Sequence, residues 1–75
     1  MAKLPRLSGK EVIKALEKAG FSSIRQKGSH VFMRKMTLEG KINAVVPMHK
    51  EIDTGTLLEI IRQSKLSRGR FMELL

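Results

Sequence analysis

Four adjacent residues, Lys27-Gly28-Ser29-His30, form the segment of this 75-residue chain that is best suited to acid–base chemistry. The unperturbed pKa of a histidine side chain is about 6.5, so it exchanges protons near neutral pH without special tuning. His30 is therefore the candidate general base or general acid. Lys27 supplies a cation, and the amides of Gly28 and Ser29 can bind an anion if the turn exposes them, because glycine permits the required backbone conformation and close approach.

A phosphodiester is the ligand that this combination favours, and RNA offers a route that needs no metal. The 2′-hydroxyl of RNA lies beside the scissile phosphate, so a base that removes its proton starts an internal displacement. Two-metal hydrolysis instead requires several converging carboxylates. The seven carboxylates are scattered, with Glu51 and Asp53 the only close pair, and the chain has no cysteine. We therefore expect metal-independent chemistry without a cofactor.

Each histidine also has an interpretation without chemistry. His30 opens an expected strand, where it can be an ordinary structural residue. His49 follows Val45-Val46-Pro47-Met48. It is a second acid–base candidate if two strands bring both histidines to one end of a sheet, and otherwise a solvated loop residue. A metal site on the two histidines lacks an evident third ligand.

The formal net charge of +8 is unevenly spread, because most of the excess lies in residues 1–35. Such a basic half favours a polyanionic partner through phosphate neutralisation and counterion release. Charge for solubility alone is the plainer interpretation. A peripheral membrane role is weaker, since the first helix has few large apolar side chains. No segment is long and apolar enough to span a membrane, and the N-terminus lacks a signal-peptide core, so we expect a cytoplasmic protein.

The cations expected to contact phosphates lie on the first helix, around the Lys-Gly-Ser-His turn and after the third strand. They are Lys10, Lys14, Arg25, Lys27 and Lys50. Lys10, Lys14 and Lys18 recur four residues apart, a spacing at which like charges repel, so this ridge is either simply solvated or relieved by phosphates. Aromatic residues are few, which disfavours a single-strand binder built on stacking platforms.

The elements that must position these residues follow an α-β-β-β-α order within one domain, residues 1–75. A capping box, Ser8-Gly9-Lys10-Glu11, opens a helix over 9–19. Strands are expected at 21–26, 30–35 and 41–46, and short connections between them indicate an antiparallel meander. A second helix, capped by Thr54 or Asp53, covers 55–65, and a helical tail covers 68–74. This predicts an α+β fold with two helices on one face of a three-stranded sheet.

The expected core members are the apolar residues of the two helices, Val12, Ile13, Leu16, Leu57, Ile60 and Ile61, with Phe71 and Leu74 closing over them. Met33, Met36 and Met48 are expected to fill the core. Strand 30–35 has apolar residues in both alternating sets, so the pattern does not settle which face is buried.

An ordered set of fragments resembles the HicA family of toxins over nearly the whole chain. These fragments are Ser8-Gly9-Lys10-Glu11-Val12, Ala19-Gly20-Phe21, Lys27-Gly28-Ser29-His30, Val45-Val46-Pro47-Met48-His49, Gly55-Thr56-Leu57, Ile60-Ile61-Arg62-Gln63, Leu66-Ser67 and Phe71. Two departures are Met33, where the family often has an aromatic residue, and Lys65, where it often has glycine after the second helix.

The resemblance implies a fold like that of a double-stranded RNA-binding domain and a small ribonuclease that cleaves mRNA, called an mRNA interferase. It implies that the histidine of the Gly-Ser-His motif, His30, is catalytic. It also implies a protein partner, an antitoxin of the HicB type that binds and inhibits the toxin.

The sequence supports two function hypotheses. One is the toxin of a type II toxin–antitoxin system, a metal-independent endoribonuclease with His30 as general acid or base. The other is a non-catalytic RNA-binding module that reads double-stranded RNA by its shape. The Gly-Ser-His turn favours the first, because a pure binder has no need of it. An interaction scaffold without nucleic acid is disfavoured by the basic half.

Overall fold

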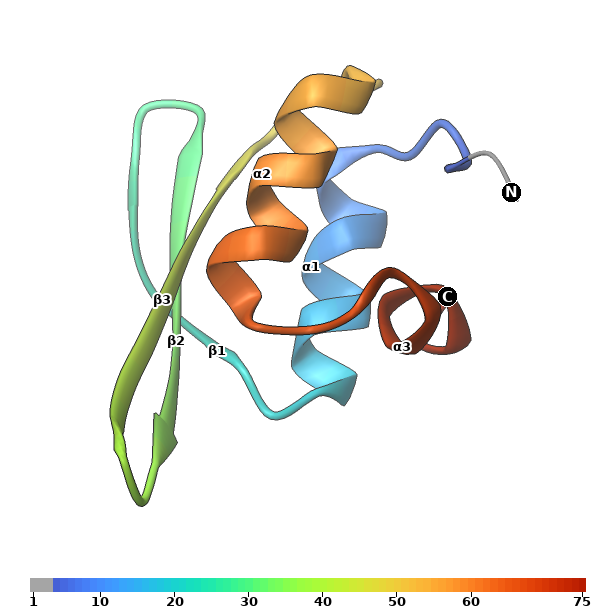
Figure 1. Cartoon of the computed structure of the whole chain (residues 1–75). Coiled ribbons are helices and arrows are strands. Elements are labelled where there is room, and N and C mark those ends of the chain that lie inside the picture. Colours follow the sequence, from blue (N-terminus) through green and yellow to red (C-terminus); the bar gives the residue numbers. More distant parts are fainter. Residues whose placement is uncertain (1–3) are drawn as a thin grey trace.

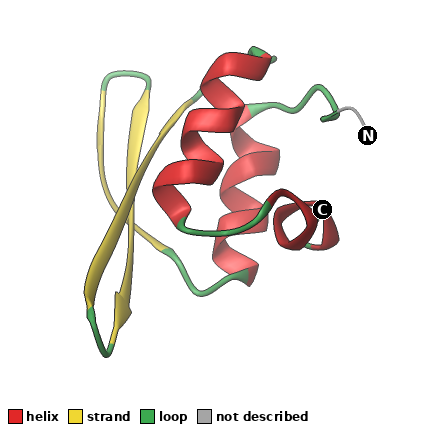
Figure 2. Cartoon of the chain, viewed as in Figure 1, coloured by secondary structure: helices red, strands yellow, loops and turns green. Residues whose placement is uncertain are grey.

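The computed structural model describes residues 4–75. Its elements, in chain order, are α1 (Gly9–Lys18), β1 (Ser22–Lys27), β2 (His30–Thr37), β3 (Gly40–Pro47), α2 (Thr54–Ser64) and α3 (Arg68–Glu73). The three strands form one antiparallel sheet in the order β1-β2-β3, with β2 in the centre. All three helices lie on one side of this sheet (Figures 1 and 2). The predicted α+β class and α-β-β-β-α order are confirmed.

Local sequence signals explain where the helices begin. The predicted capping box of α1 is present: the Glu11 amide donates to the Ser8 hydroxyl over 3.2 Å, and the Ser8 amide donates to the Glu11 carboxylate over 3.0 Å. Asp53, rather than Thr54, caps α2, accepting from the Thr56 amide. Ser67 caps α3, as predicted, by accepting from the Arg70 amide. The four N-terminal amides of a helix lack intrahelical acceptors, and these side chains satisfy part of that need.

The orientation of the helices brings their first turns to one end of the molecule. Figure 1 shows that α1 and α2 both begin at the end that holds the β1–β2 turn, while the β2–β3 turn lies at the opposite end. The Val45 amide of the edge strand β3 donates to the Gln63 side chain of α2 over 3.1 Å, which ties the second helix to the sheet.

The core lies between the helices and the sheet. Five of the six predicted helix members are buried there, and Phe71 and Leu74 close over them as predicted. Ile13 was predicted to be in the core and is only partly buried, because it packs at the margin of α1 against it. Met33 fills the core as predicted, whereas Met36 does not, since 67% of it is exposed.

The register settles which face of β2 is buried. Val31 and Met33 face the helices and pair with Val46 and Ala44 of β3. His30 and Phe32 alternate with them and therefore belong to the opposite, outer face. Both faces of β2 carry apolar side chains, so the sequence pattern alone could not show which face is buried. Packing against the core buries the face of Val31 and Met33.

Several predicted strand ends differ from the structure. Phe21 is buried but precedes β1, which begins at Ser22. Pro47 lies within β3 as its last residue rather than after it. Between Ser23 and Arg25 the register shifts, so Ile24 occupies a bulge and is 47% exposed. A bulge interrupts the alternation of a strand, which explains why an apolar residue in β1 is not buried.

Candidate active site and nucleic-acid interface

The Lys-Gly-Ser-His segment forms the tight turn between β1 and β2. Lys27 ends β1 and is paired with His30, which opens β2, so Gly28 and Ser29 are the only two residues of the loop. Gly28 has φ 59°, a left-handed value that glycine adopts without strain, and a Cβ there would meet nothing within 4 Å. The left-handed backbone conformation therefore favours glycine at this position. Crowding does not, because a side chain would have room there. The Gln26 side-chain amide donates to the Gly28 carbonyl over 3.1 Å and braces the turn.

This turn is joined to the segment that carries the second histidine. The Met48 amide donates to the Ser29 carbonyl over 2.6 Å, and His30 is the register partner of Pro47. His49 therefore lies next to the turn that holds His30, at the same end of the sheet. This is the arrangement under which His49 is a second acid–base candidate, and both imidazoles are exposed.

The first turn of α1 fixes the position of the His49 segment. The Gly9 amide donates to the His49 carbonyl over 2.9 Å. A Cβ on Gly9 would lie 2.3 Å from the Pro47 carbonyl oxygen, so the helix approaches this segment as closely as only glycine allows. Two predicted phosphate contacts are placed here, because Lys10 and Lys50 line a hollow of about 200 Å³ together with Ser8, Met48 and His49.

The remaining predicted phosphate contacts are in two different places. Arg25 and Lys27 pair with Phe32 and His30 in the register, so they share the outer face of the sheet with these residues. The Arg25 guanidinium lies over the Phe32 ring, 5.0 Å from its centroid. Lys14, in contrast, lines a hollow of about 160 Å³ beside the C-terminal residues Leu74 and Leu75.

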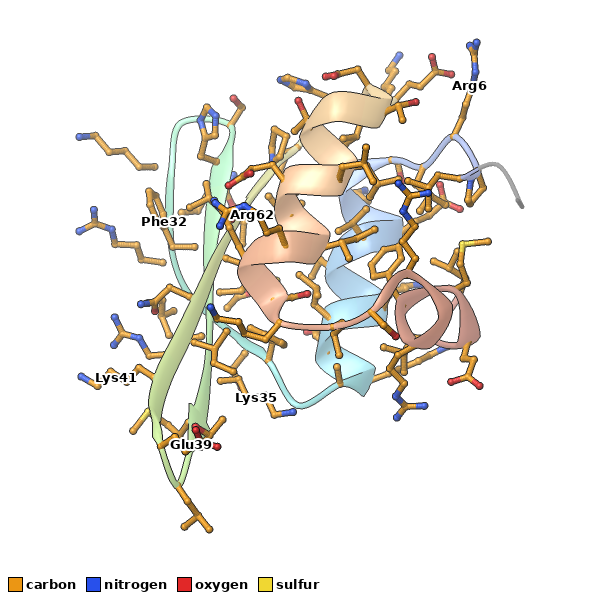
Figure 3. All side chains as sticks on the ribbon, viewed as in Figure 1. Arg6, Phe32, Lys35, Glu39, Lys41 and Arg62 are labelled. Carbon is orange, nitrogen blue, oxygen red and sulfur yellow. The ribbon has the colours of Figure 1, made fainter. Side chains whose placement is uncertain are left out.

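Sequence reasoning did not include the cations that continue the outer face beyond Phe32. Arg34 follows at the next outward position of β2, and its Nε donates to the Asn43 Oδ1 of β3 over 2.8 Å. Lys41 is the register partner of Met36, further along the same face. Figure 3 shows Phe32 and Lys41 on the side of the sheet away from the helices, and Lys35 on the helix side. The alternation that starts at His30 is the signal that finds Arg34, once the buried face is known.

Two carboxylates at the starts of α1 and α2 have lowered pKa values. The Ser8 amide and hydroxyl, which hydrogen-bond to the Glu11 carboxylate, hold its pKa below the usual value. The Thr56 hydroxyl and amide do the same for the pKa of Asp53. Hydrogen bonds to a carboxylate favour its charged form.

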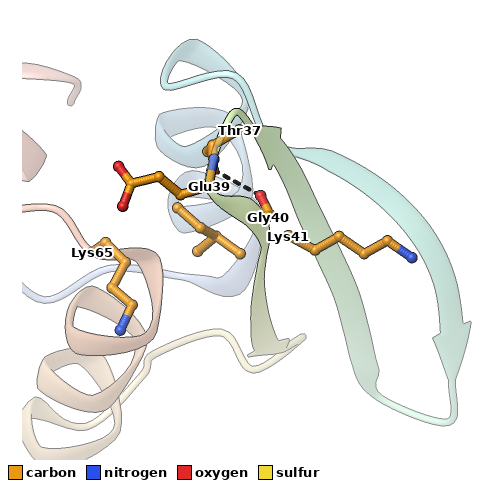
Figure 4. Close-up of a pocket in the computed structure, with 6 residues that line it drawn as sticks. Thr37, Glu39, Gly40, Lys41 and Lys65 are labelled. Atoms are coloured by element: carbon orange, nitrogen blue, oxygen red, sulfur yellow. Dashed lines mark hydrogen bonds between the residues drawn. The ribbon is translucent and has the colours of Figure 1, made fainter.

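Another hollow lies far from the histidines. It measures about 420 Å³ and is lined by Thr37, Glu39, Gly40, Lys41, Ile42 and Lys65 at the β2–β3 turn. Figure 4 shows this open site, with the Thr37 hydroxyl donating to the Gly40 carbonyl over 2.7 Å. Seven residues along β2 separate it from His30, which corresponds to about 23 Å at the rise of a strand. It is not part of the candidate active site.

Most of the chain matches the sequence pattern of a known protein family. Residues 9–66 match the family described as "HicA toxin of bacterial toxin-antitoxin". The chain belongs to the HicA toxin family. The match covers α1, the three strands and α2, and it includes both histidines and the Gly-Ser-His turn. A comparison with curated proteins gives no significant match.

Membership in the HicA toxin family makes the chain a toxin of a bacterial toxin–antitoxin system and implies an antitoxin partner. Over residues 4–75, no three histidine, aspartate or glutamate side chains gather in a way that could hold a metal ion. Within the same residues, none of the helices has the length and apolar character needed to cross a bilayer.

Proposed function

We propose that this HicA toxin is an endoribonuclease that cleaves mRNA without a metal ion, with His30 as its general base or acid. The observation that carries the proposal is the exposed imidazole of His30 at a two-residue turn, paired in the register with Lys27 and next to the segment of His49. A ribonuclease of this family needs one group that moves a proton and nearby cations that stabilise the phosphorane, and this end of the sheet has both.

The proposed reaction is an internal displacement. His30 removes the proton of the 2′-hydroxyl, the 2′-oxygen attacks the adjacent phosphorus, and the bond from phosphorus to the 5′-oxygen breaks. The leaving 5′-oxygen takes up a proton and departs as a 5′-hydroxyl. His49 is the candidate donor of that proton. The products are a 2′,3′-cyclic phosphate, which hydrolysis opens to a 3′-phosphate, and a 5′-hydroxyl end. Lys27, with the amides of Gly28 and Ser29, stabilises the charge that develops on the phosphate oxygens.

The partners and compartment follow from this activity. The antitoxin is proposed to be of the HicB type and to restrain cleavage by binding the toxin. The protein is proposed to act in the cytoplasm, where its mRNA substrate is found. The proposed phosphate contacts are Lys10, Lys14, Arg25, Lys27 and Lys50. No cofactor is proposed.

Cleavage of a labelled RNA by the purified protein in excess chelator tests the proposal. His30→Ala is expected to reduce the rate by about 10²–10⁴-fold, the usual contribution of a general acid or base, while the thermal transition and antitoxin binding are retained. DNA, and RNA with a 2′-methoxy group at the cut site, are expected to resist. Full activity of His30→Ala overturns the site, and cleavage of the blocked RNA overturns the internal displacement. RNA binding without any cleavage would instead support a non-catalytic binding module.

A further inference from the structure

The charge of this protein is segregated between its two layers. The three strands carry five lysine or arginine residues and no aspartate or glutamate, whereas the three helices carry six basic and four acidic residues. Lys35 is the one strand cation on the helix side of the sheet, as Figure 3 shows. The other four strand cations, Arg25, Lys27, Arg34 and Lys41, belong to the outer face. The face opposite the helices is thus the uniformly positive surface of the described residues.

These outer cations are also available for a ligand. Among residues 4–75, the ion pairs join Arg6 to Glu51, Arg62 to Glu59 and Arg70 to Glu73, all of them outside the sheet. No such pair in that range involves a cation of the outer face. The side chain of Arg34 is oriented through its Nε by Asn43, and this contact neutralises none of its charge.

Alongside the cations, the outer face offers one site where a base could stack. Phe32 is two residues from His30 on the same face of β2, a separation of about 7 Å. Its ring and the Arg25 guanidinium above it form a planar, cationic and partly exposed pair. Unpaired bases stack on aromatic rings and on guanidinium planes, so this pair suits a base one nucleotide away from a phosphate held at His30.

We propose that single-stranded RNA lies along the outer face of the sheet, with a base stacked on the Arg25–Phe32 pair and the following phosphates on Arg34 and Lys41. This deepens the proposed function, on which it rests, by naming the path of the substrate. A duplex does not fit this role, because its bases are already stacked and cannot reach Phe32. A protein partner fits less well, because two of the four outer cations are lysines, which are usually depleted from protein interfaces.

The test measures binding rather than cleavage, so that its result does not depend on the chemistry. The parent is the His30→Ala protein, and the probe is a fluorescent single-stranded RNA 12-mer, titrated at several salt concentrations. Phe32→Leu is expected to weaken binding roughly 5- to 100-fold, the range for loss of one stacked base, while Phe32→Tyr retains it. Arg34→Gln and Lys41→Gln are each expected to lower the salt dependence by about 0.7, the value for one phosphate contact on a single strand.

An exposed cation of the helix layer provides a matched control. Arg68→Gln on α3 removes the same charge as Arg34→Gln, and it is expected to leave the affinity and the salt slope at the parent values. Thermal transitions of all variants show that each remains folded.

Three results overturn the proposed path. They are parental affinity in both Phe32→Leu and Arg34→Gln, tighter binding of a duplex than of the single strand, and loss of antitoxin binding with RNA binding unchanged. The last result assigns the outer face to a protein. If His30→Ala abolishes cleavage while the face variants bind as the parent does, the path alone is wrong. If His30→Ala cleaves fully, the proposed function is wrong, and the binding data still locate the RNA.

Discussion

The Gly9 amide donates a hydrogen bond to the His49 carbonyl over 2.9 Å, which joins the first residue of α1 to the segment carrying the second histidine. This contact is possible because Gly9 has no side chain. The neighbouring Met48 amide binds the Ser29 carbonyl, so the helix, the His49 segment and the Gly-Ser-His turn form one continuous chain of contacts.

Gly9→Ala is expected to destabilise the protein and to disturb the site. Its Cβ would lie 2.3 Å from the Pro47 oxygen and 2.9 Å from the Met48 Cα, both backbone atoms that must shift. Overpacking of this kind costs about 1–3 kcal/mol, measured by denaturant unfolding. Gly69→Ala is the matched control, because its Cβ meets nothing within 4 Å and alanine favours a helix. If the two variants are equally stable, the backbone at Pro47 and Met48 shifts without a cost in free energy, and the prediction is wrong.

Lys65→Gly is expected to stabilise the protein by about 0.5–1 kcal/mol. Lys65 follows α2 with φ 65° and ψ 13°, a left-handed conformation that costs most residues energy and that glycine adopts freely. Lys65→Ala is the control, since it removes the same charge but keeps the strain. Chemical denaturation of the three proteins separates the two effects, and equal gains in both variants would trace the change to charge.

The Asp53 cap is expected to contribute a pH-dependent part of the stability. Its pKa is lowered in the folded protein by hydrogen bonds from Thr56, so the folded state binds the proton less tightly than the unfolded chain does. The contribution is therefore complete above the unfolded pKa of about 3.9 and is lost as the pH falls through the lower, folded value.

Thermal melts of the parent protein and Asp53→Ala between about pH 2 and about pH 7, a range that includes the titration of an aspartate and extends to neutral pH, provide the measurement. The difference in Tm is expected to be widest near neutral pH and to narrow below about pH 4. Asp53→Asn keeps a capping oxygen without this titration. A constant gap across the whole range would contradict the role of the carboxylate.

The roles of the two histidines are expected to separate with a sulfur-containing substrate. If His49 protonates the leaving 5′-oxygen, replacing that oxygen by sulfur removes the need for the proton donor, because a thiolate leaves readily. His49→Ala is then expected to cleave the sulfur substrate at nearly the parent rate, while His30→Ala remains slow. If His49→Ala lowers the cleavage rate equally on both substrates, His49 is not the proton donor and is only a residue of the loop.

Lys10 and Lys14 are expected to differ in their effect on RNA binding. Lys10 lines the hollow next to His49, whereas Lys14 lies beside the C-terminus, although both were predicted to contact phosphates. Lys10→Gln is expected to lower the salt slope by about 0.7 and Lys14→Gln to lower it less. Equal loss in both single variants would show that the RNA covers the whole exposed ridge of α1.

The sequence by itself determined the element order, the caps and most of the core. Ser8, Glu11 and Ser67 cap their helices as predicted, because capping depends on residues within one turn of each other. Val12, Leu16, Leu57, Ile60 and Ile61 are buried as predicted, because an apolar stripe at helical spacing must face the core. The family signal is equally local, since it lies in short fragments of fixed order.

Only the tertiary structure decided which face of β2 carries His30 and what shares that face. Both alternating sets of that strand contain apolar residues, so the choice depends on packing against α1 and α2, which no local pattern encodes. The bulge at Ile24 and the partial burial of Ile13 escape the sequence pattern for the same reason. The contact of Gly9 with the His49 segment joins residues forty positions apart, and the free energy that favours it comes from the packing of the whole fold.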